Sequence, residues 1–180
     1  MKSDLRRFGK PLLLAVCIFA TLMLAGSEQP AVQVDPEAGG PRALEAQTRA
    51  AVVRDYLQAW KSLSGALQEN RADLLDASFV GTAKEKLTDT VREQQALGMK
   101  TIYRDLSHDL KVVFYSPEGL SIQLVDTVQY EVQVIDHDRV QATQHLSTRY
   151  VAVLTPTEVR WKVRVFQAQP ESVTGQRSEP

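Results

Sequence analysis

The second half of the chain alternates apolar and polar residues with a period of two. Apolar side chains recur at every second position, mostly in one phase within each stretch, over 110–114, 120–134, 140–154 and 159–165. Turn-forming residues separate these stretches at 116–119, 136–138 and 155–157. A period of two places the apolar side chains on one face of a strand, and short turns join antiparallel neighbours. The pattern therefore predicts a curved four-stranded antiparallel sheet with one apolar face.

The first half of the chain has helical periodicity instead. Between residues 43 and 68, apolar side chains recur every three or four positions, which gives one broad stripe along a helix. Asn70 and Asp73 are suited to cap a short second helix. Thr82 and Glu85 have the spacing of a capping box that opens a third helix, with Gly98 at its end. We therefore expect an α+β fold in which three N-terminal helices pack on the four-stranded sheet.

The N-terminus has the pattern of an export signal. Four basic residues among the first ten precede an uncharged apolar run of 16 residues, Pro11 to Gly26. Such a run spans about 24 Å as a helix, slightly less than the roughly 30 Å core of a bilayer. Residues 1–27 are therefore a signal peptide cleaved before Glu28, or an uncleaved membrane anchor. Either interpretation places the rest of the chain outside the cytoplasm, periplasmic or extracellular or tethered facing outward.

Composition and segment boundaries narrow the function further. The only cysteine, Cys17, lies in the apolar run, so the exported part has no thiolate site or disulfide. Removing residues 1–27 leaves 17 basic and 21 acidic residues, so the charge balance gives no indication of nucleic-acid binding. Residues 28–42, rich in Pro and Gly, are expected to form a flexible linker. The folded domain is expected over 43–168, with a disordered tail at 169–180.

The order of elements resembles one known superfamily. Helices followed by a long meander that closes on Val159-Arg160-Trp161-Lys162-Val163 resemble the cone-shaped nuclear-transport-factor-2-like (SnoaL-like) superfamily over residues 43–168. That superfamily includes ketosteroid isomerases, SnoaL-like cyclases and limonene epoxide hydrolases. It also includes non-catalytic modules on N-terminal membrane anchors, such as Mce-associated proteins. The exported layout is more similar to this second group, which implies a non-catalytic binding or scaffolding module of the cell envelope without a cofactor.

One charged residue interrupts the apolar face of the sheet. Asp126 is in phase with Leu124 and Val128, so we expect its side chain to point toward the helices. A carboxylate in an apolar cavity has a raised pKa and can act as a general acid or base. Tyr56 on the long helix could supply a hydroxyl, as the Tyr-Asp pair does in the isomerases that the chain resembles. The alternative function is thus a small-molecule binder or enzyme, whereas an Asp126 paired with a base or facing solvent would be structural.

Two further groups of residues are candidates for binding. Aromatic side chains expected inside the sheet could line a pocket or simply form core: Trp60, Tyr130, Tyr150 and Trp161. The opposite face is polar and locally basic, which suits a protein partner or a homodimer as well as plain solvent exposure. Its interface candidates are His145, Arg149, Arg160, Lys162 and Arg164.

No pattern of metal ligands is evident. Asp136-His137-Asp138 is typical of a hairpin turn. His108, His137 and His145 are expected on different elements, so they do not form a cluster. We therefore expect no metal site.

Overall fold

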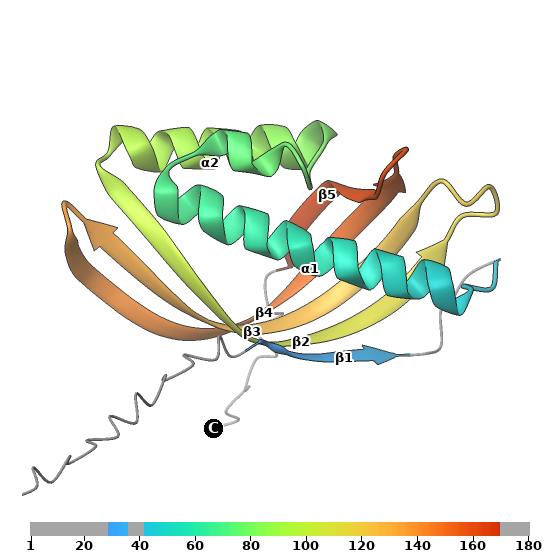
Figure 1. Cartoon of the computed structure of the whole chain (residues 1–180). Helices are drawn as coiled ribbons and strands as arrows, with labels where there is room; N and C mark the ends of the chain where they lie inside the picture. Colours follow the sequence, from blue (N-terminus) through green and yellow to red (C-terminus); the bar gives the residue numbers. More distant parts are fainter. Residues whose placement is uncertain (1–28, 36–41, 170–180) are drawn as a thin grey trace, which may run out of the picture.

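A computed structural model describes residues 29–35 and 42–169. Its elements follow the chain in this order: strand β1 (Ala31–Asp35), helix α1 (Ala46–Glu69), a 3-10 helix (Ala72–Leu75), helix α2 (Gly81–Ala96), and strands β2 (Met99–Tyr115), β3 (Ile122–Asp136), β4 (Arg139–Pro156) and β5 (Trp161–Gln169). The strands form one sheet in the order β1-β2-β3-β4-β5. Figure 1 shows the sheet as the lower layer and both helices as the upper layer.

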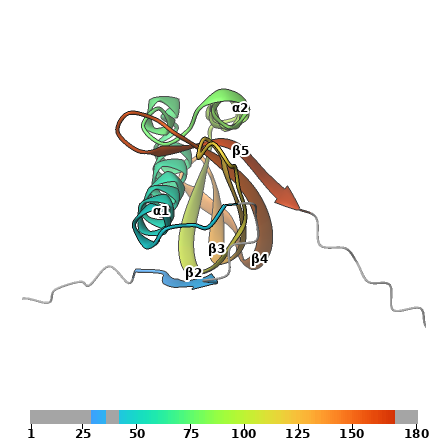
Figure 2. The ribbon, with the colours of Figure 1, turned by 90° about the vertical axis from the view of Figure 1, so that its right-hand side faces the viewer.

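The sheet is a long meander that curls around the helices. Strands β2 to β5 pair antiparallel with their neighbours, as the alternating pattern predicts. The end-on view shows the helices on the concave side of the curl (Figure 2). Strand β2 is interrupted by register shifts between Asp105 and Ser107 and between Val112 and Phe114. Such bulges bend a strand and increase its twist, which helps to close the sheet around α1.

The core lies between α1 and the middle of the sheet. The apolar stripe of α1 is buried, with Tyr56 fully inaccessible and Trp60 2% exposed. From the sheet, β3 contributes Leu124 and Val128, which are completely buried on the same face. Burying one large apolar side chain stabilises a fold by roughly 1.5–3 kcal/mol, so this stripe and this face hold the two layers together.

The sheet has five strands, not the four expected. Residues 31–35, which lie within the predicted flexible linker 28–42, form β1 and pair parallel with β2 from Ser107 to Lys111. Val34 packs against the core and Lys111 Nζ lies 3.9 Å from Asp35 Oδ2. Part of the predicted linker is thus an edge strand of the sheet. The folded part therefore begins before residue 43.

The helical layer also differs from the expectation of three helices. The predicted short second helix is a single 3-10 turn, so only α1 and α2 are α-helices within the described residues. Asn70 does not start it; Asn70 ends α1 in the left-handed conformation, and its Nδ2 donates to the carbonyl of Met99. The predicted capping box is wrong, because the N-cap of α2 is Val80 and Thr82 Oγ1 donates to the Arg164 carbonyl instead.

The predicted turns take up the conformations that their residues favour. His137 and Asp138 both have positive φ between β3 and β4, and Gly119 has φ of 74° between β2 and β3. Gly98 follows α2 with φ of 69°, which suits the residue after a helix C-cap.

The predicted export signal, residues 1–27, lies outside the described residues, and so do residues 170–180 of the predicted tail 169–180. Gln169, the first residue of that tail, is the last residue of β5. Within 29–35 and 42–169, no helix combines the length and apolar character needed to cross a membrane.

Candidate functional site

A buried polar cluster joins α1 to the two central strands. Tyr56 Oη donates a hydrogen bond to Asp126 Oδ2 at 3.0 Å, and His108 Nδ1 lies 2.7 Å from the same oxygen. The Asp126 side chain is 0% exposed, and His108 and Tyr56 are at most 1% exposed. Because an ionised carboxylate can only accept, Nδ1 carries the proton that points to Asp126. We call Tyr56, His108 and Asp126 the polar cluster.

The strand registers explain why these three side chains meet. Both register shifts between β2 and β3 skip a residue of β2, and β3 pairs with β4 without a shift from Ile122 to Val134, so Asp126 keeps the inward phase expected for it. The bulge after Asp105 resets the phase of β2, and from there His108 shares the inward face with Leu110. Tyr56 lies in the middle of the buried stripe of α1.

An aromatic shell packs around the cluster. The indole ring of Trp60 lies edge-on to the His108 ring, with centroids 5.5 Å apart, and to the Tyr150 ring at 5.1 Å. Tyr130 is also within ring contact of Trp60, and its hydroxyl lies 3.1 Å from Thr148 Oγ1. Three of the four predicted pocket residues therefore pack together on the concave face of the sheet: Trp60, Tyr130 and Tyr150.

Trp161, the fourth, lies elsewhere. It is the first residue of β5 and packs, half-buried, against the edge of the core. Its backbone N–H donates to Asp55 Oδ2 at 2.9 Å, which fastens the β4–β5 turn to α1.

Burial and charge shift the pKa values within the cluster. Burial opposes the charged form of His108, but the neighbouring carboxylates of Asp105 and Asp126 outweigh this effect and raise the pKa of His108 to about 9. Burial raises the pKa of Asp126, against the hydrogen bonds from His108 and Tyr56. Burial and the Asp126 carboxylate together raise the pKa of Tyr56 well above its ordinary value. At neutral pH, His108 is thus an imidazolium and Tyr56 a neutral donor.

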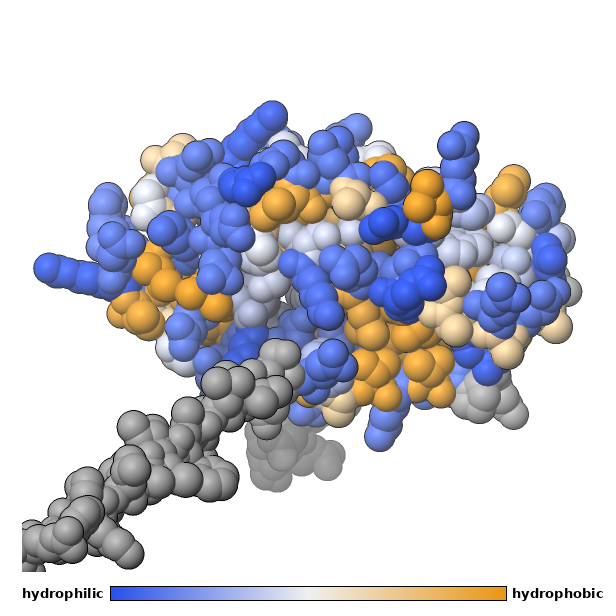
Figure 3. Space-filling model, viewed as in Figure 1, coloured by the Kyte–Doolittle hydropathy of each residue, from blue (hydrophilic) through white to orange (hydrophobic). Residues whose placement is uncertain are grey.

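A small cavity opens beside His108. Its volume is about 120 Å³, and it lies between the start of β1, α1 and β2. Its walls include Pro30, Val32, Leu57, Lys61, Asp105 and His108. Figure 3 shows apolar surface on this side of the molecule, along the lower edge where β1 runs. The predicted sites Asp126 and Tyr56 do not line this cavity, which reaches the cluster only through His108.

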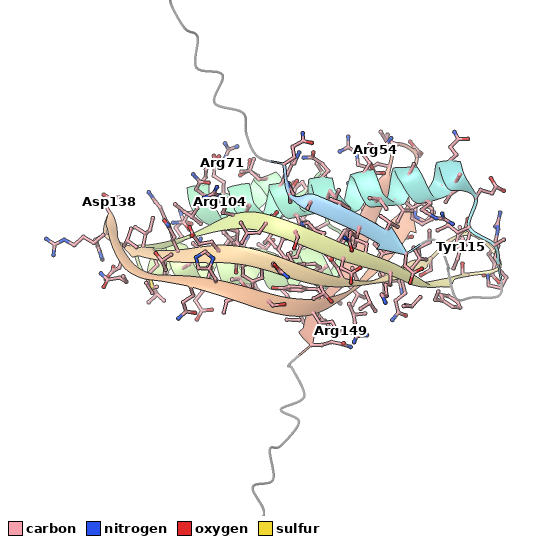
Figure 4. The ribbon with its side chains drawn as sticks, turned by 90° about the horizontal axis from the view of Figure 1, so that it is seen from below. Arg54, Arg71, Arg104, Tyr115, Asp138 and Arg149 are labelled. Carbon is pink, nitrogen blue, oxygen red and sulfur yellow. The ribbon has the colours of Figure 1, made fainter. Side chains whose placement is uncertain are left out.

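The interface candidates separate into two groups. His145 and Arg149 are exposed on β4, and Figure 4, which views the sheet from below, shows Arg149 on the side of the sheet away from β1. Lys162 is half-buried at the beginning of β5, where it pairs with Thr155 and its Nζ donates to the Asp76 carbonyl. Arg149 and Thr155 are six residues apart on β4, or about 20 Å along the strand.

The other two interface candidates, Arg160 and Arg164, also lie at the β4–β5 end, where their backbone carbonyls accept hydrogen bonds. Arg160 lies in the turn, where its carbonyl accepts from Thr157 Oγ1 at 2.7 Å, and Arg164 lies at a bulge in β5 where its carbonyl accepts from Thr82. The five candidates therefore lie in two places, an exposed stretch on β4 and the β4–β5 end of the sheet.

Metal ligands do not gather in the part of the chain that the structure describes. No three His, Cys, Asp or Glu side chains lie close enough there to hold an ion. His137 pairs with its neighbour Asp136 at the exposed hairpin tip, and His145 Nε2 lies 3.4 Å from Glu131 Oε2 on the outer face.

His108 is the one member of the polar cluster that is not among the predicted site residues. It has the same phase as Leu110 and Val112, which was the available signal that it points inward. The three histidines do lie on different elements, but His108 gathers acidic partners instead of other histidines.

Comparisons with known proteins identify the fold. Neither a family model nor a curated protein matches the sequence. Among solved structures, the intermembrane space region of the chloroplast protein ARC6 is similar at 18% identity and a TM-score of 0.61, over 71% of this chain and 98% of that one. A protein of the NTF2-like family from Streptomyces avermitilis is similar at 11% identity and 0.47, over 67% and 97%. A hexachlorocyclohexane dehydrochlorinase is similar at 10% identity and 0.46, over 75% and 100%.

The chain therefore shares its α+β fold, helices packed on one curved sheet, with the ARC6 intermembrane space region. A fold shared at this level of sequence identity does not establish a function.

Proposed function

We propose that the chain is a non-catalytic binding module that faces outward in a cell envelope and holds a protein partner on the outer face of its sheet. The observation that carries this proposal is the sealing of the polar cluster. A general acid or base must come within hydrogen-bond reach of its substrate. Tyr56, His108 and Asp126 are at most 1% exposed, and neither Tyr56 nor Asp126 lines the cavity of about 120 Å³ beside His108.

The outer face of β4 offers a surface for such a partner. His145, Ser147 and Arg149 are exposed there at alternate positions, and Glu131 on β3 lies opposite His145. Charged and polar side chains on a broad sheet face suit a protein partner or a second copy of this chain.

Two observations support a location in the cell envelope. The basic residues and apolar run at the N-terminus have the pattern of an export signal or outward-facing anchor. The ARC6 region, which has the same fold, is described as an intermembrane space region. N-terminal sequencing of the protein from its native host tests this part: a start at Glu28 indicates a released domain, and an intact Met1 or Lys2 an anchored one. A protein confined to the cytosol would contradict export in both forms.

A photo-cross-linking experiment tests the partner surface. A photoreactive amino acid is placed at position 149 or 145 in the full chain in its native host, and at exposed position 92 on α2 as the matched control. We expect an adduct of discrete mass from positions 149 and 145 but not from 92, and loss of the position-145 adduct in an Arg149→Glu variant. No adduct, or equal adducts at all three positions, would contradict the proposed surface.

A second function, a small-molecule enzyme that uses Asp126 and Tyr56, is favoured by one observation. Their hydrogen bond places a carboxylate of raised pKa beside a phenol donor, which is a chemically competent pair. This function requires a substrate to reach Asp126. A compound that stabilises the wild-type chain in a thermal shift screen and loses its effect in Asp126→Asn would favour the enzyme over the partner-binding module.

A further inference from the structure

The small cavity between β1, α1 and β2 has one polar end. There, His108 is 1% exposed, and its Nε2 atom is inaccessible to solvent and has no hydrogen-bond partner. Asp105 Oδ1 is likewise buried without a partner, and both residues line the cavity. Leaving such a group unpaired in a protein interior costs about 1–3 kcal/mol. Two unpaired polar atoms, one a donor and one an acceptor, therefore belong to residues that line the same cavity.

The distance between the two side chains suits a single bridging oxygen. His108 Nε2 lies 3.8 Å from Oδ2 of Asp105, the other oxygen of that carboxylate, which is within ion-pair distance but too far for a direct hydrogen bond. His108 Nε2 carries a proton because the ring is an imidazolium at neutral pH. A hydroxyl group between them can accept from Nε2 and donate to the carboxylate of Asp105, which neither a pure donor nor a pure acceptor can do.

The other walls define the remainder of the ligand. Pro30 and Val32 on one side and Leu57 on the other present apolar surface. A volume of about 120 Å³ is close to that of an apolar protein cavity of about 150 Å³ that accepts benzene. The cationic side chains near the polar end, His108 and Lys61, are balanced by Asp105 and Asp126, so a neutral ligand is favoured over an ion.

We propose that this cavity binds a small neutral molecule that carries one hydroxyl group on an apolar body of about six carbons. The hydroxyl bridges His108 Nε2 and Asp105, and the apolar body lies against Val32 and Leu57. This site is separate from the outer face of the sheet, so it goes beyond the partner-binding function proposed above and does not depend on it.

The site also involves the N-terminal strand. Gln29, Pro30 and Val32 form part of its wall, and Val32 pairs with His108 across the β1–β2 ladder. The cavity is complete only when β1 is in place on the edge of the sheet. A ligand held there therefore stabilises the pairing of β1 with β2.

Phenol and toluene form a matched pair of probes for the full chain, because they differ by a hydroxyl in place of a methyl group. The imidazole nitrogen and carbon-bound proton signals of His108 are followed by NMR during titration with each probe. We expect saturable shifts of the His108 signals with phenol and at least tenfold weaker binding of toluene. Equal binding of both probes would show that the cavity is apolar and does not recognise a hydroxyl group, and it would overturn the proposal. His108 signals that neither probe shifts would overturn it as well.

Two variants separate occupancy of the cavity from loss of folding. Leu57→Phe fills the apolar part and is expected to abolish phenol binding, whereas Leu146→Phe, at a half-exposed position on β4, leaves it unchanged. Asp105→Leu removes the acceptor and is expected to weaken phenol at least tenfold while leaving toluene binding within twofold. Thermal unfolding of each variant confirms that it is folded. Undiminished phenol binding in folded Leu57→Phe or Asp105→Leu would overturn the proposed site.

Discussion

Tyr56 and Asp126 lie 70 residues apart in the sequence, yet the hydroxyl of the first donates to the carboxylate of the second at 3.0 Å inside the core. This bond links the middle of α1 to β3, the central strand of the sheet. Because Asp126 also pairs with His108, one carboxylate oxygen connects the helix with two strands. A buried network of this kind favours one arrangement of the two layers, since each alternative leaves a polar group unpaired.

Removing the hydroxyl of Tyr56 tests the strength of this link. Tyr56→Phe keeps the ring in the core but deprives Asp126 of one donor. We expect the free energy of unfolding to fall by about 1–2 kcal/mol in urea denaturation. Tyr115→Phe is the matched control, because the Arg42 guanidinium packs over that ring, 5.0 Å from its centroid, whether or not the hydroxyl is present. Equal effects of the two substitutions would contradict a specific role of the Tyr56 hydroxyl.

Replacing Asp126 by leucine distinguishes a paired carboxylate from an isolated one. Asp126→Leu leaves His108 Nδ1 and Tyr56 Oη buried without their acceptor, so we expect the melting temperature to fall and the fold to lose about 3–5 kcal/mol. Asp109→Leu, at an exposed position of β2, should change stability by less than about 0.5 kcal/mol. A higher melting temperature for Asp126→Leu would mean that the carboxylate opposes folding.

The pH dependence of stability follows from the raised pKa of His108. The unfolded chain titrates His108 at about 6.5 and the folded chain at about 9. A raised folded-state pKa stabilises the fold fully below about pH 6.5, and this contribution is lost as pH rises through 9. Urea denaturation should show the free energy of unfolding falling by up to roughly 3 kcal/mol between pH 6 and pH 9.5. His108→Gln should flatten this slope; a slope that is unchanged in the variant would assign it to other groups.

Substitution by alanine should change the free energy of unfolding in opposite directions at two glycines. At Gly65, within α1, a Cβ would meet only Leu74 Cδ1 at an ordinary 3.5 Å, so Gly65→Ala should stabilise by roughly 0.5–1 kcal/mol through helix propensity. At Gly98, φ is 69° and a Cβ would lie 2.9 Å from His137 Nε2, so Gly98→Ala should destabilise by about 1 kcal/mol or more. Chemical denaturation of both variants checks the pair, and equal signs would contradict this assignment of backbone strain.

The sequence predicts those parts of the fold that repeat a period many times. The strand period of the meander and the helical period of α1 each repeat many times. A single exception such as Asp126 therefore does not obscure the pattern. The same phase argument placed Asp126 on the inner face, where the structure has it. Strand β1 was overlooked because five residues are too short for a clear alternation, and its partner on β2 is far away in the sequence.

Bulges explain most of what the sequence left undecided about the site. The register shift after Asp105 sets which residues of β2 face inward, and nothing in the local residue types marks it. The basic interface candidates were grouped by phase alone, but the register of β4 with β5 separates Arg149 from Lys162. The sequence of one strand therefore predicts which of its side chains share a face. Which residues of two strands lie side by side depends on the register between them, and the sequence of one strand does not contain it.

The parallel edge strand has a practical consequence for anyone who produces this domain. A fragment begun at residue 43, where helical periodicity starts, would leave the backbone of 107–111 on β2 without its partner. Uncovered strand backbone recruits other chains, so such a fragment should self-associate more readily than one begun at residue 28. A fragment must therefore begin before Ala31 to keep β1 paired with β2.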